Sequence, residues 1–377
     1  MAVDSHSEAA LQPFVRKRLT GTQQFILALS RVWGWVFLLL LIVFFSITGT
    51  GFLSLRNSQN ILIAIVPVLL LGLGQTFIII AGGIDLSVNY VMGLASVVMA
   101  IVIRDLVATG TPETVAILIG MGLGIVAAVI PGLINGLIVA KLRVTSFIVT
   151  LGMSFVVRGL GYLLSDGNVV GGQPPGVRLF GNEALLYYIP GEGGGLYFFQ
   201  RPEVVGEQLR VLERIFPWPV VVLAIVVGIG IFILSRTQFG RHTYAIGGNR
   251  EAAIRAGILV DRHTILLFVM SGFTAGLAGV LHTARFNGGS AIAGEAQLLP
   301  SIAAVIIGGV SMFGGVGTIW GTIIGALIMA VLQTGLVMLA VESFWQWIIV
   351  GIIVIIAVLI DQSRDLIVGR AEAQVTE

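Results

Sequence analysis

The chain contains no cysteine, and only two of its 377 residues are lysine. The absence of cysteine excludes disulfides and thiolate chemistry. A phosphate-binding P-loop needs the sequence Gly-Lys-Ser/Thr, but Lys17 follows Arg16 and Lys141 follows Ala140. The chain therefore cannot be a P-loop ATPase, and if ATP drives its function, the ATPase is another polypeptide.

Patterns that carry catalysis or metal binding are also missing. The four histidines have no metal-ligand spacing, and neither G-x-S-x-G nor H-E-x-x-H occurs. Residues 122–127 imitate a dinucleotide fingerprint, but they lie inside an apolar run with no strand context. We therefore expect no catalytic residue, no metal site and no enzyme activity.

Charge is scarce. Only 11% of the residues are charged and 56% are hydrophobic, whereas a soluble domain carries about 25% charged residues. The net charge of +2 does not suggest nucleic acid, because the basic residues lie in loops. The apolar runs are long and continuous rather than alternating, which argues against a β-barrel. The sequence predicts an all-α, polytopic membrane helix bundle surrounded by the lipid bilayer.

A transmembrane helix needs about 20 apolar residues, and on this basis the chain has about ten spans. The boundary near 82–85 has almost no loop, and the run at 298–312 is short enough to be a half-helix. The predicted spans are 33–52, 60–81, 85–107, 114–139, 145–165, 217–235, 264–285, 298–312, 317–340 and 344–361.

Lysine and arginine are more numerous on one side of these spans, and the positive-inside rule makes that side the cytoplasm. We therefore predict a cytoplasmic N-terminal tail at 1–32, a membrane domain at 33–363 and a cytoplasmic C-terminal tail at 364–377. Within the membrane domain, 236–263 is predicted to be cytoplasmic and 166–216 to be a long periplasmic loop.

The long loop has two parts. Its first half is rich in glycine, proline and aromatic residues, which predicts irregular structure. Val205, Leu209, Leu212 and Phe216 then recur at helical spacing and predict an amphipathic helix. Such a helix would either lie on the lipid interface or serve as a docking ledge for an external partner.

The segment 236–263 is polar and basic. Gly247, Gly248 and Asn249 are expected to break the chain, and Asn249 is a good N-cap for a helix over 250–256. Glu251 and Arg255 are spaced for an i,i+4 ion pair, and Gly257 is a natural stop. A basic loop that only stays soluble remains the alternative, but such a loop needs no capped helix. The predicted helix has a face of small residues, Ala252, Ala253 and Ala256, with Ile254 and Ile258 as apolar contacts.

Polar side chains at membrane depth tend to be functional. The chain places seven candidates for a translocation pathway in or beside its spans, with a helix break at Asp85 and Arg158 as one possible partner for that acid. The alternative for each is a hydrogen bond between helices that fixes packing. The candidates are Gln75, Thr76, Asp85, Ser87, Asn135, Arg158 and Gln333.

Several ordered motifs between about residues 60 and 360 resemble the permease subunit of ribose-type bacterial ABC sugar importers. They begin with Gly74 to Val88 (G-Q-T-F-I-I-I-A-G-G-I-D-L-S-V) and include Phe239 to Asn249 (F-G-R-H-T-Y-A-I-G-G-N). The others are Gly132 to Gly136, Phe147 to Gly152, Arg158-Gly159, Ile302 to Gly309 and Gly314 to Thr318.

The resemblance implies that the segment 236–263 docks into a groove on a separate ATPase subunit, which holds ATP and Mg. It also implies a second permease copy in a homodimer, a periplasmic sugar-binding protein and a place in the bacterial inner membrane. The ATPase-coupling residues would be Phe239, Gly240, Arg241, Ala245, Gly247, Gly248, Asn249, Glu251, Ala252, Ala253 and Gly257.

Two departures from the family pattern bear on the substrate. Val144-Thr145-Ser146 stands where a proline is usual, and Leu298-Leu299-Pro300 replaces Glu-Leu-Asp. They are compatible with a monosaccharide other than ribose or with a polyol. A permease for branched-chain amino acids or nucleosides remains an alternative. An ion-coupled secondary transporter is a further one, although it would need several intramembrane acids, and the spans offer little beyond Asp85.

Overall fold

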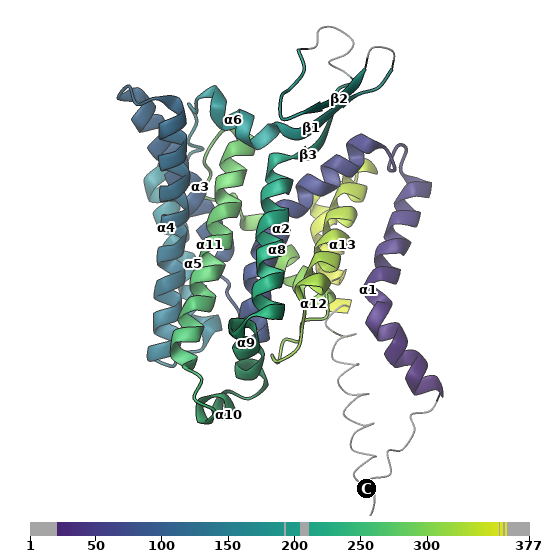
Figure 1. The fold of residues 1–377 in the computed structure, drawn as a ribbon, viewed down its shortest axis with the longest axis vertical. Coiled ribbons are helices and arrows are strands. Elements are labelled where there is room, and N and C mark those ends of the chain that lie inside the picture. Colours follow the sequence, from purple (N-terminus) through teal and green to yellow (C-terminus); the bar gives the residue numbers. More distant parts are fainter. Residues whose placement is uncertain (1–20, 192–193, 204–210, 354, 357–358, 360–377) are drawn as a thin grey trace, which may run out of the picture.

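The protein is an all-helical membrane bundle with one small sheet at an end (Figure 1). The structure, a computed structural model, describes residues 21–353 except 192–193 and 204–210, together with 355, 356 and 359. Within these residues, seven helices are long and apolar enough to cross a membrane. They are α2 (Leu55–Ile80), α3 (Val88–Ala108), α4 (Glu113–Lys141), α5 (Ser146–Ser165), α8 (Trp218–Arg236), α11 (Val260–Phe286) and α13 (Ile319–Met338).

Three further predicted spans correspond to shorter apolar helices. These are Trp33–Thr48 in α1 (Gly21–Thr48), the stretch Glu295–Ile307, and Ser343–Ile353. The second comprises η1 (Glu295–Gln297) and α12 (Leu298–Ile307). The ten-residue α12 confirms the predicted half-helix.

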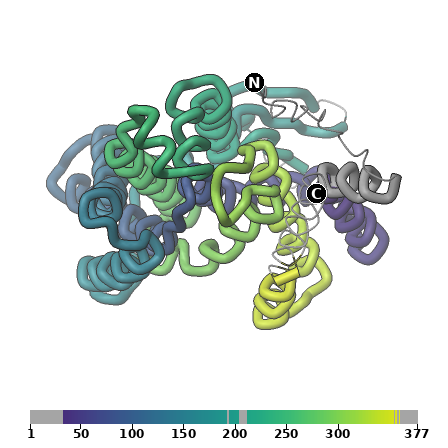
Figure 2. The backbone as a smooth tube through the Cα atoms, turned by 90° about the horizontal axis from the view of Figure 1, so that it is seen from below, coloured from purple at the N-terminus to yellow at the C-terminus, as the bar shows by residue number. Residues whose placement is uncertain are grey.

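Helices α2 and α11 form the centre of the bundle. In their most apolar windows, 83% of α2 and 72% of α11 residues are buried, against 28% for α4 and α5. Helix α11 packs against α4, α3 and α2, while α1 lies at one edge (Figure 2). The large apolar side chains that α4 and α5 expose, such as Leu118, Phe155 and Leu163, suit a lipid environment.

Glycines allow several pairs of helices to pack closely. A β-carbon at Gly132 of α4 would lie 2.4 Å from the carbonyl oxygen of Phe268 in α11, and one at Gly272 would lie 2.6 Å from that of Ala128. Gly325 of α13 approaches the carbonyl of Ala304 in α12 in the same way. Small residues let helix backbones approach closely where no larger side chain would fit.

The predicted long loop is more ordered than its composition suggests. It contains α6 (Pro175–Asn182) and the strands β1 (Ala184–Ile189), β2 (Gly195–Phe198) and β3 (Glu213–Pro217). The strands form an antiparallel sheet in the order β2-β1-β3. The prediction of irregular structure is therefore wrong, because strand pairing satisfies backbone groups that composition alone leaves unassigned.

The predicted amphipathic helix is wrong at its end, where Glu213 to Pro217 pair with β1 as a strand. Residues 204–210 of that stretch lie outside the described residues. Tyr187 of β1 is buried beneath the sheet. Its hydroxyl donates to the Glu183 carboxylate and accepts from the Ala184 amide at 2.9 Å. Burial and the bond to Glu183 raise the pKa of Tyr187 to about 12.

The two ends of the bundle differ. The sheet lies at one end, here called the sheet end, and α9 (Gln238–Gly248) and α10 (Arg250–Arg255) lie at the other, here called the α10 end (Figure 1).

Candidate translocation and coupling site

The chain breaks between α2 and α3, as predicted. Helix α2 ends at Ile80, and α3 begins at Val88. The amides of Gly82 and Gly83 bond the carbonyls of Ile79 and Ile78 at 2.9 Å, and Gly82 has a φ of 83°. This left-handed glycine closes the last turn of α2 and turns the chain back into the bundle.

The Asp85 carboxylate lies buried inside this break. It accepts hydrogen bonds from the Ser87 amide at 2.9 Å, the Ser87 hydroxyl at 2.6 Å and the Ser271 hydroxyl at 2.8 Å. The Gln75 side chain holds the backbone of Asp85, donating to its carbonyl and accepting from its amide at 3.3 Å. Asn135 donates to the Ser87 hydroxyl at 3.0 Å. We call Gln75, Asp85, Ser87, Asn135 and Ser271 the Asp85 network.

Helix α5 supports the same break from another side. The Ile84 amide donates to the Ser146 hydroxyl at 3.1 Å, and the Leu86 amide donates to the Thr150 hydroxyl at 3.0 Å. The broken backbone is thus satisfied by protein, as membrane depth requires. Because α2, α3, α4, α5 and α11 all contribute, the break joins five helices.

Sequence reasoning placed Gln75, Asp85, Ser87 and Asn135 in one candidate set, and the structure brings them together. It missed Ser271, Ser146 and Thr150. Small hydroxyl residues are common in apolar helices, and only the fold shows which of them face the break. Thr76, the fifth candidate, bonds Thr322 of α13 at 2.7 Å, and it therefore ties α2 to a further helix.

Arg158 and Gln333 lie elsewhere. The Arg158 guanidinium lies over the rings of Tyr90 and Tyr162, at 5.2 and 5.8 Å from their centroids. No ion pair joins Arg158 to Asp85 in the described part of the chain. The proposed pairing is wrong because Arg158 follows Thr150 by eight residues, which is about 12 Å along the helix. Gln333 lines a separate cavity near the sheet end.

The local structure predicted for 249–257 is confirmed. Asn249 caps α10 by accepting from the Ala252 amide at 2.9 Å, and Arg255 pairs with Glu251 at 3.0 Å. Gly257 has a φ of 82°, which fits a helix stop. The break predicted over 247–249 falls at Asn249 alone, because α9 runs through Gly247 and ends at Gly248.

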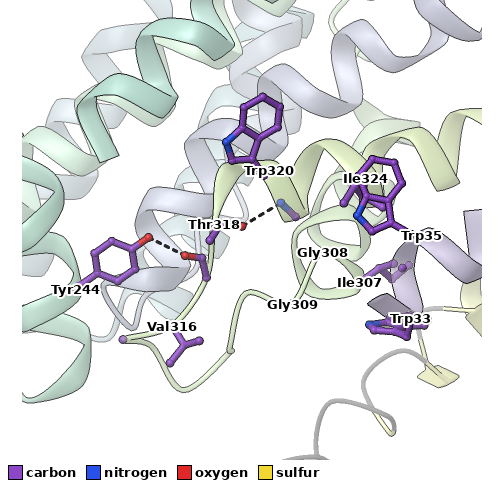
Figure 3. Close-up of a pocket in the computed structure, with 14 residues that line it drawn as sticks. Trp33, Trp35, Tyr244, Ile307, Gly308, Gly309, Val316, Thr318, Trp320 and Ile324 are labelled. Atoms are coloured by element: carbon purple, nitrogen blue, oxygen red, sulfur yellow. Dashed lines mark hydrogen bonds between the residues drawn. The ribbon is translucent and has the colours of Figure 1, made fainter. Parts of the chain in front are cut away.

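Helix α9 needs Gly247 for close packing rather than for a turn. A β-carbon there would lie 1.7 Å from the Ile80 carbonyl oxygen and 2.6 Å from the Gly315 amide nitrogen. The Gly315 amide itself donates to the Ile80 carbonyl at 2.8 Å. Tyr244 donates to the Gly317 carbonyl at 2.6 Å (Figure 3). One face of α9 therefore touches both the end of α2 and the turn before α13.

The ends of α2 and α12 have the same construction. At the end of α12, the Gly309 amide bonds the Ile306 carbonyl at 2.8 Å and the Val310 amide bonds the Val305 carbonyl at 3.2 Å. Gly309 has a φ of 81°, close to that of Gly82. Residues 81–84 (A-G-G-I) and 307–310 (I-G-G-V) therefore form two equivalent helix ends.

A second set of contacts joins α9 to α11. The Thr243 hydroxyl and His263 Nε2 lie 2.8 Å apart. The ring of Phe239 lies 4.1 Å from that of His263 and 6.2 Å from that of Phe77, measured between centroids. A shift of α9 would therefore reach α2 and α11, the helices that carry Gln75 and Ser271.

The eleven predicted coupling residues divide into two groups. Phe239, Gly240, Gly247 and Ala253 face the bundle: Gly240 is buried against Leu234, and Ala253 packs with Ile246 and Val260. The expectation that Ala253 belongs to an open small-residue face is therefore wrong. The others are exposed, and they are Arg241, Ala245, Gly248, Asn249, Glu251, Ala252 and Gly257. Together with the exposed Ile254, Ala256 and Leu259, they form what we call the α10 surface.

A cavity of about 540 Å³ opens beside the turn before α13 (Figure 3). Trp33, Trp35 and Trp320 line it together with Tyr244 and the backbone of Gly308 and Gly309. Tryptophan is enriched at membrane–water interfaces, so these rings mark the interface at the α10 end. No group of three or more potential metal ligands occurs among the residues that the structure describes.

The chain is similar in sequence to known transport proteins. The family model for the branched-chain amino acid transport system / permease component matches residues 57–358. The chain is 36% identical to the ribose import permease protein RbsC of Bacillus subtilis, covering 87% of this chain and 91% of the relative.

Two other relatives are equally similar. The fructose import permease protein FrcC of Rhizobium meliloti is 35% identical, over 87% of this chain and 83% of its own. The xylose transport system permease protein XylH of Haemophilus influenzae is 37% identical, over 86% of this chain and 94% of its own. No solved structure matches the chain.

Proposed function

The chain belongs to the family of branched-chain amino acid transport system / permease components, and from this we propose that it is the transmembrane permease subunit of an ABC importer for a small carbohydrate. The observation that carries the proposal is the packing of α9 against the bundle. It contacts the end of α2 and the turn before α13 on one face, while the neighbouring α10 surface is open for a partner. A transport component without a P-loop needs such a link to a separate ATPase.

Carbohydrate is favoured as substrate because the relatives are named for import of ribose, fructose and xylose. The family description names branched-chain amino acids instead, so a permease for these or for nucleosides is the second candidate. An ion-coupled transporter is disfavoured. Asp85 is the single buried acid among the described residues, and three hydrogen bonds from Ser87 and Ser271 already hold its carboxylate.

Three partners follow from the proposal. An ATP-binding cassette subunit, carrying ATP and Mg, would dock on the α10 surface. A periplasmic sugar-binding protein would dock at the sheet end, where β1, β2 and β3 project from the bundle (Figure 1). A second permease copy would complete a homodimer with a translocation path between the two bundles.

The mechanism would be alternating access. ATP binding closes the ATPase pair and moves α10 and α9. Because Gly247 packs against the Ile80 carbonyl and Tyr244 bonds the Gly317 carbonyl, the movement passes to the end of α2 and the start of α13. From there the Asp85 network connects it to α3, α4 and α11.

The proposal also sets an orientation. The α10 end and both termini would face the cytoplasm, and the sheet end would face the periplasm across the bacterial inner membrane. Because the chain has no cysteine, a single introduced cysteine shows on which side of the membrane its position lies. Leu259→Cys lies exposed at the α10 end and Thr109→Cys lies exposed after α3. In intact spheroplasts, a membrane-impermeant maleimide should label Thr109→Cys alone, and the reverse pattern would contradict the orientation.

Two experiments test the function itself: co-purification of an ATPase and uptake of a sugar. Tagged protein from detergent-solubilised native membranes should bring down a P-loop ATPase, identified by mass spectrometry. Vesicles that contain both subunits should then take up a monosaccharide in the presence of ATP and the binding protein, with the proton gradient collapsed. Uptake that stops when the gradient collapses, with no ATPase recovered, would instead support a secondary transporter.

A further inference from the structure

Four polar side chains meet on the outside of the bundle, where α3, α5 and η1 come together. The Tyr90 hydroxyl of α3 donates to the Glu295 carboxylate of η1 at 3.2 Å. The Arg158 guanidinium of α5 lies over the rings of Tyr90 and Tyr162, at 5.2 and 5.8 Å from their centroids. Glu295 is exposed, and the other three are partly exposed. We call these four residues the Tyr90 cluster.

The Tyr90 cluster lies within membrane-spanning segments. Helices α3 and α5 are both long and apolar enough to cross a membrane, and Glu295 begins the shorter apolar stretch Glu295–Ile307. At about 1.5 Å per residue, Arg158 lies about 18 Å from the first residue of α5 and about 10 Å from the last. A positive and a negative side chain are therefore placed at membrane depth on a surface that their own bundle leaves open.

Lipid is an unfavourable neighbour for this surface. A charged side chain in the hydrocarbon region is costly, and such residues almost always face protein or a water-filled cavity. Neither Arg158 nor Glu295 forms an ion pair within the described part of the chain, so their charges are not neutralised by direct contact there. The surface therefore requires water or a second protein in front of it.

Helix α5 has a different surface on its other side. Val156, Leu160 and Leu163 are exposed apolar side chains, and they lie roughly 140–200° around the helix axis from Arg158. Tyr162 follows Arg158 by four residues and shares its face. One side of α5 thus suits lipid, and the side with Arg158 and Tyr162 does not.

The chemistry of the Tyr90 cluster favours a ligand without net charge. Arg158 provides N–H donors and Glu295 provides carboxylate acceptors. An anion would be attracted by Arg158 but repelled by Glu295, and a cation would meet the reverse. Hydroxyl groups both donate and accept, so a neutral molecule with several hydroxyls can bond both charged groups. The ring of Tyr162 adds an apolar surface for the C–H groups of such a molecule.

We propose that the Tyr90 cluster lines the translocation path between the two bundles and contacts the monosaccharide or polyol as it passes. The proposal rests on the proposed function, which supplies both the second bundle and the hydroxyl-rich substrate. It turns the shared face of α3, α5 and η1 toward the path, and the homodimer brings a second Tyr90 cluster to the same path. Arg158 is then a pathway residue although it does not contact Asp85.

The first experiment asks whether the cluster faces water. The chain has no cysteine, so Tyr162→Cys and Leu163→Cys each introduce a single thiol into the full-length protein, held in lipid nanodiscs. Leu163 is 73% exposed and lies nearer the end of α5, so depth alone favours its reaction. A charged methanethiosulfonate should nevertheless modify Tyr162→Cys faster by about tenfold or more, because the reacting thiolate forms in water.

Two results of this experiment would overturn the proposal. Equal rates at the two positions would show that the faces of α5 do not differ. An unreactive Tyr162→Cys would place the cluster in a dry contact between copies or against lipid. The labelling needs no transport, so it decides the position of the cluster whichever substrate the protein carries.

The second experiment asks whether the cluster contacts the substrate. Arg158→Gln and Glu295→Gln each remove one charge and should lower ATP-driven monosaccharide uptake roughly tenfold, the effect of one hydrogen bond to a charged group. The melting temperature and the recovered ATPase should equal those of wild type, which a folding defect would not allow. Arg104→Gln is the matched control, because Arg104 is exposed near the other end of α3 and pairs with Asp105 at 2.8 Å.

Uptake also separates this proposal from the proposed function. If wild type takes up sugar and both cluster variants do so at the wild-type rate, only the proposed substrate contact fails. If wild-type vesicles take up leucine and no monosaccharide, the carbohydrate assignment fails together with the ligand proposed for the cluster. If they take up neither while Tyr162→Cys alone is labelled, the proposed function fails, and the cluster still faces water.

Discussion

Gly247 of α9 is seated on the last carbonyl of α2 so closely that a β-carbon would lie 1.7 Å from the Ile80 oxygen. The next residue, Gly248, has open space where its β-carbon would be. The two adjacent glycines therefore have different environments. Substitution of Gly247 tests packing within the permease, and substitution of Gly248 tests docking of a partner.

The first prediction uses this pair. Gly247→Ala forces α9 away from α2 and should lower stability by about 1–3 kcal/mol, as overpacking does. Gly248→Leu should leave the melting temperature unchanged, because a β-carbon at this exposed position has open space around it. Differential scanning fluorimetry of the detergent-solubilised proteins gives both values.

The same Gly248→Leu protein tests the α10 surface. We expect it to lose most of the co-purifying ATPase, since a bulky side chain on an exposed docking face keeps the partner away. Full recovery of the ATPase by this variant would remove Gly248 from the interface.

The second prediction distinguishes two alanines of α10. Ala253 is buried against Ile246 and Val260, whereas Ala252 is exposed. Ala253→Leu should reduce the amount of folded protein in the membrane. Ala252→Leu should insert normally and reduce ATP-driven uptake several-fold. Quantitative blotting of membranes beside uptake assays compares the two, and an interchange of these results would contradict the assigned faces of α10.

The third prediction concerns Tyr244. Burial raises the pKa of Tyr244, so its hydroxyl stays protonated and donates to Gly317 throughout the physiological range. Tyr244→Phe removes the bond and should loosen the turn before α13. ATP hydrolysis should continue while uptake falls, giving a lower ratio of sugar moved to ATP hydrolysed. Tyr188→Phe, on the more exposed Tyr188 ring of β1, is the matched change, and an equal ratio in both variants would exclude a coupling role for the bond.

The fourth prediction concerns the Asp85 network. Asp85→Asn keeps the size of the side chain but replaces one acceptor oxygen with a donor, which then meets the Ser87 or Ser271 side of the site. We expect a loss of roughly 2–4 kcal/mol of stability and strongly impaired uptake. Ser271→Ala removes one bond and should cost about 1–2 kcal/mol. Ser235→Ala, an exposed serine that bonds only its own helix, serves as the control, and an Asp85→Asn protein as stable as this control would mean that the network does not hold the break.

The fifth prediction is a pH dependence at the sheet end. The pKa of Tyr187 is raised from its ordinary value of 10.0 to about 12, because burial and the bond to Glu183 favour the protonated form. The resulting stabilisation is complete below pH 10 and is lost as pH rises from 10 to 12. Absorbance of tyrosinate should therefore show one tyrosine that ionises near pH 12, which Tyr187→Phe abolishes. A wild-type titration without this late step would place Tyr187 in contact with solvent.

Local features of the coupling segment could be predicted from the sequence because they depend on neighbours in the chain. The Asn249 cap, the Glu251–Arg255 pair and the Gly257 stop each involve residues within a few positions of one another. The helix break at Asp85 was predictable for the same reason, since two glycines and an acid interrupt an apolar run.

Strand formation in the segment 166–216 could not be predicted in this way. Tyr187 pairs with Tyr197 on one side and Arg214 on the other, and such pairing depends on parts of the chain that meet only after folding. The helical spacing that ends at Phe216 was overridden by these contacts, because tertiary pairing outweighs local propensity.

The sequence by itself determined that this protein is a polytopic helical membrane chain without a P-loop motif, since hydropathy adds along the chain and a motif consists of consecutive residues. It also determined which residues cap and stop α10. Only the tertiary structure decided that Ala253 faces inward and Gly248 outward, that Ser271 rather than Arg158 holds Asp85, and that Gln333 lies in a cavity of its own. These outcomes depend on which helix faces meet, and helix packing fixes that through contacts between residues more than a hundred positions apart, such as Asp85 and Ser271.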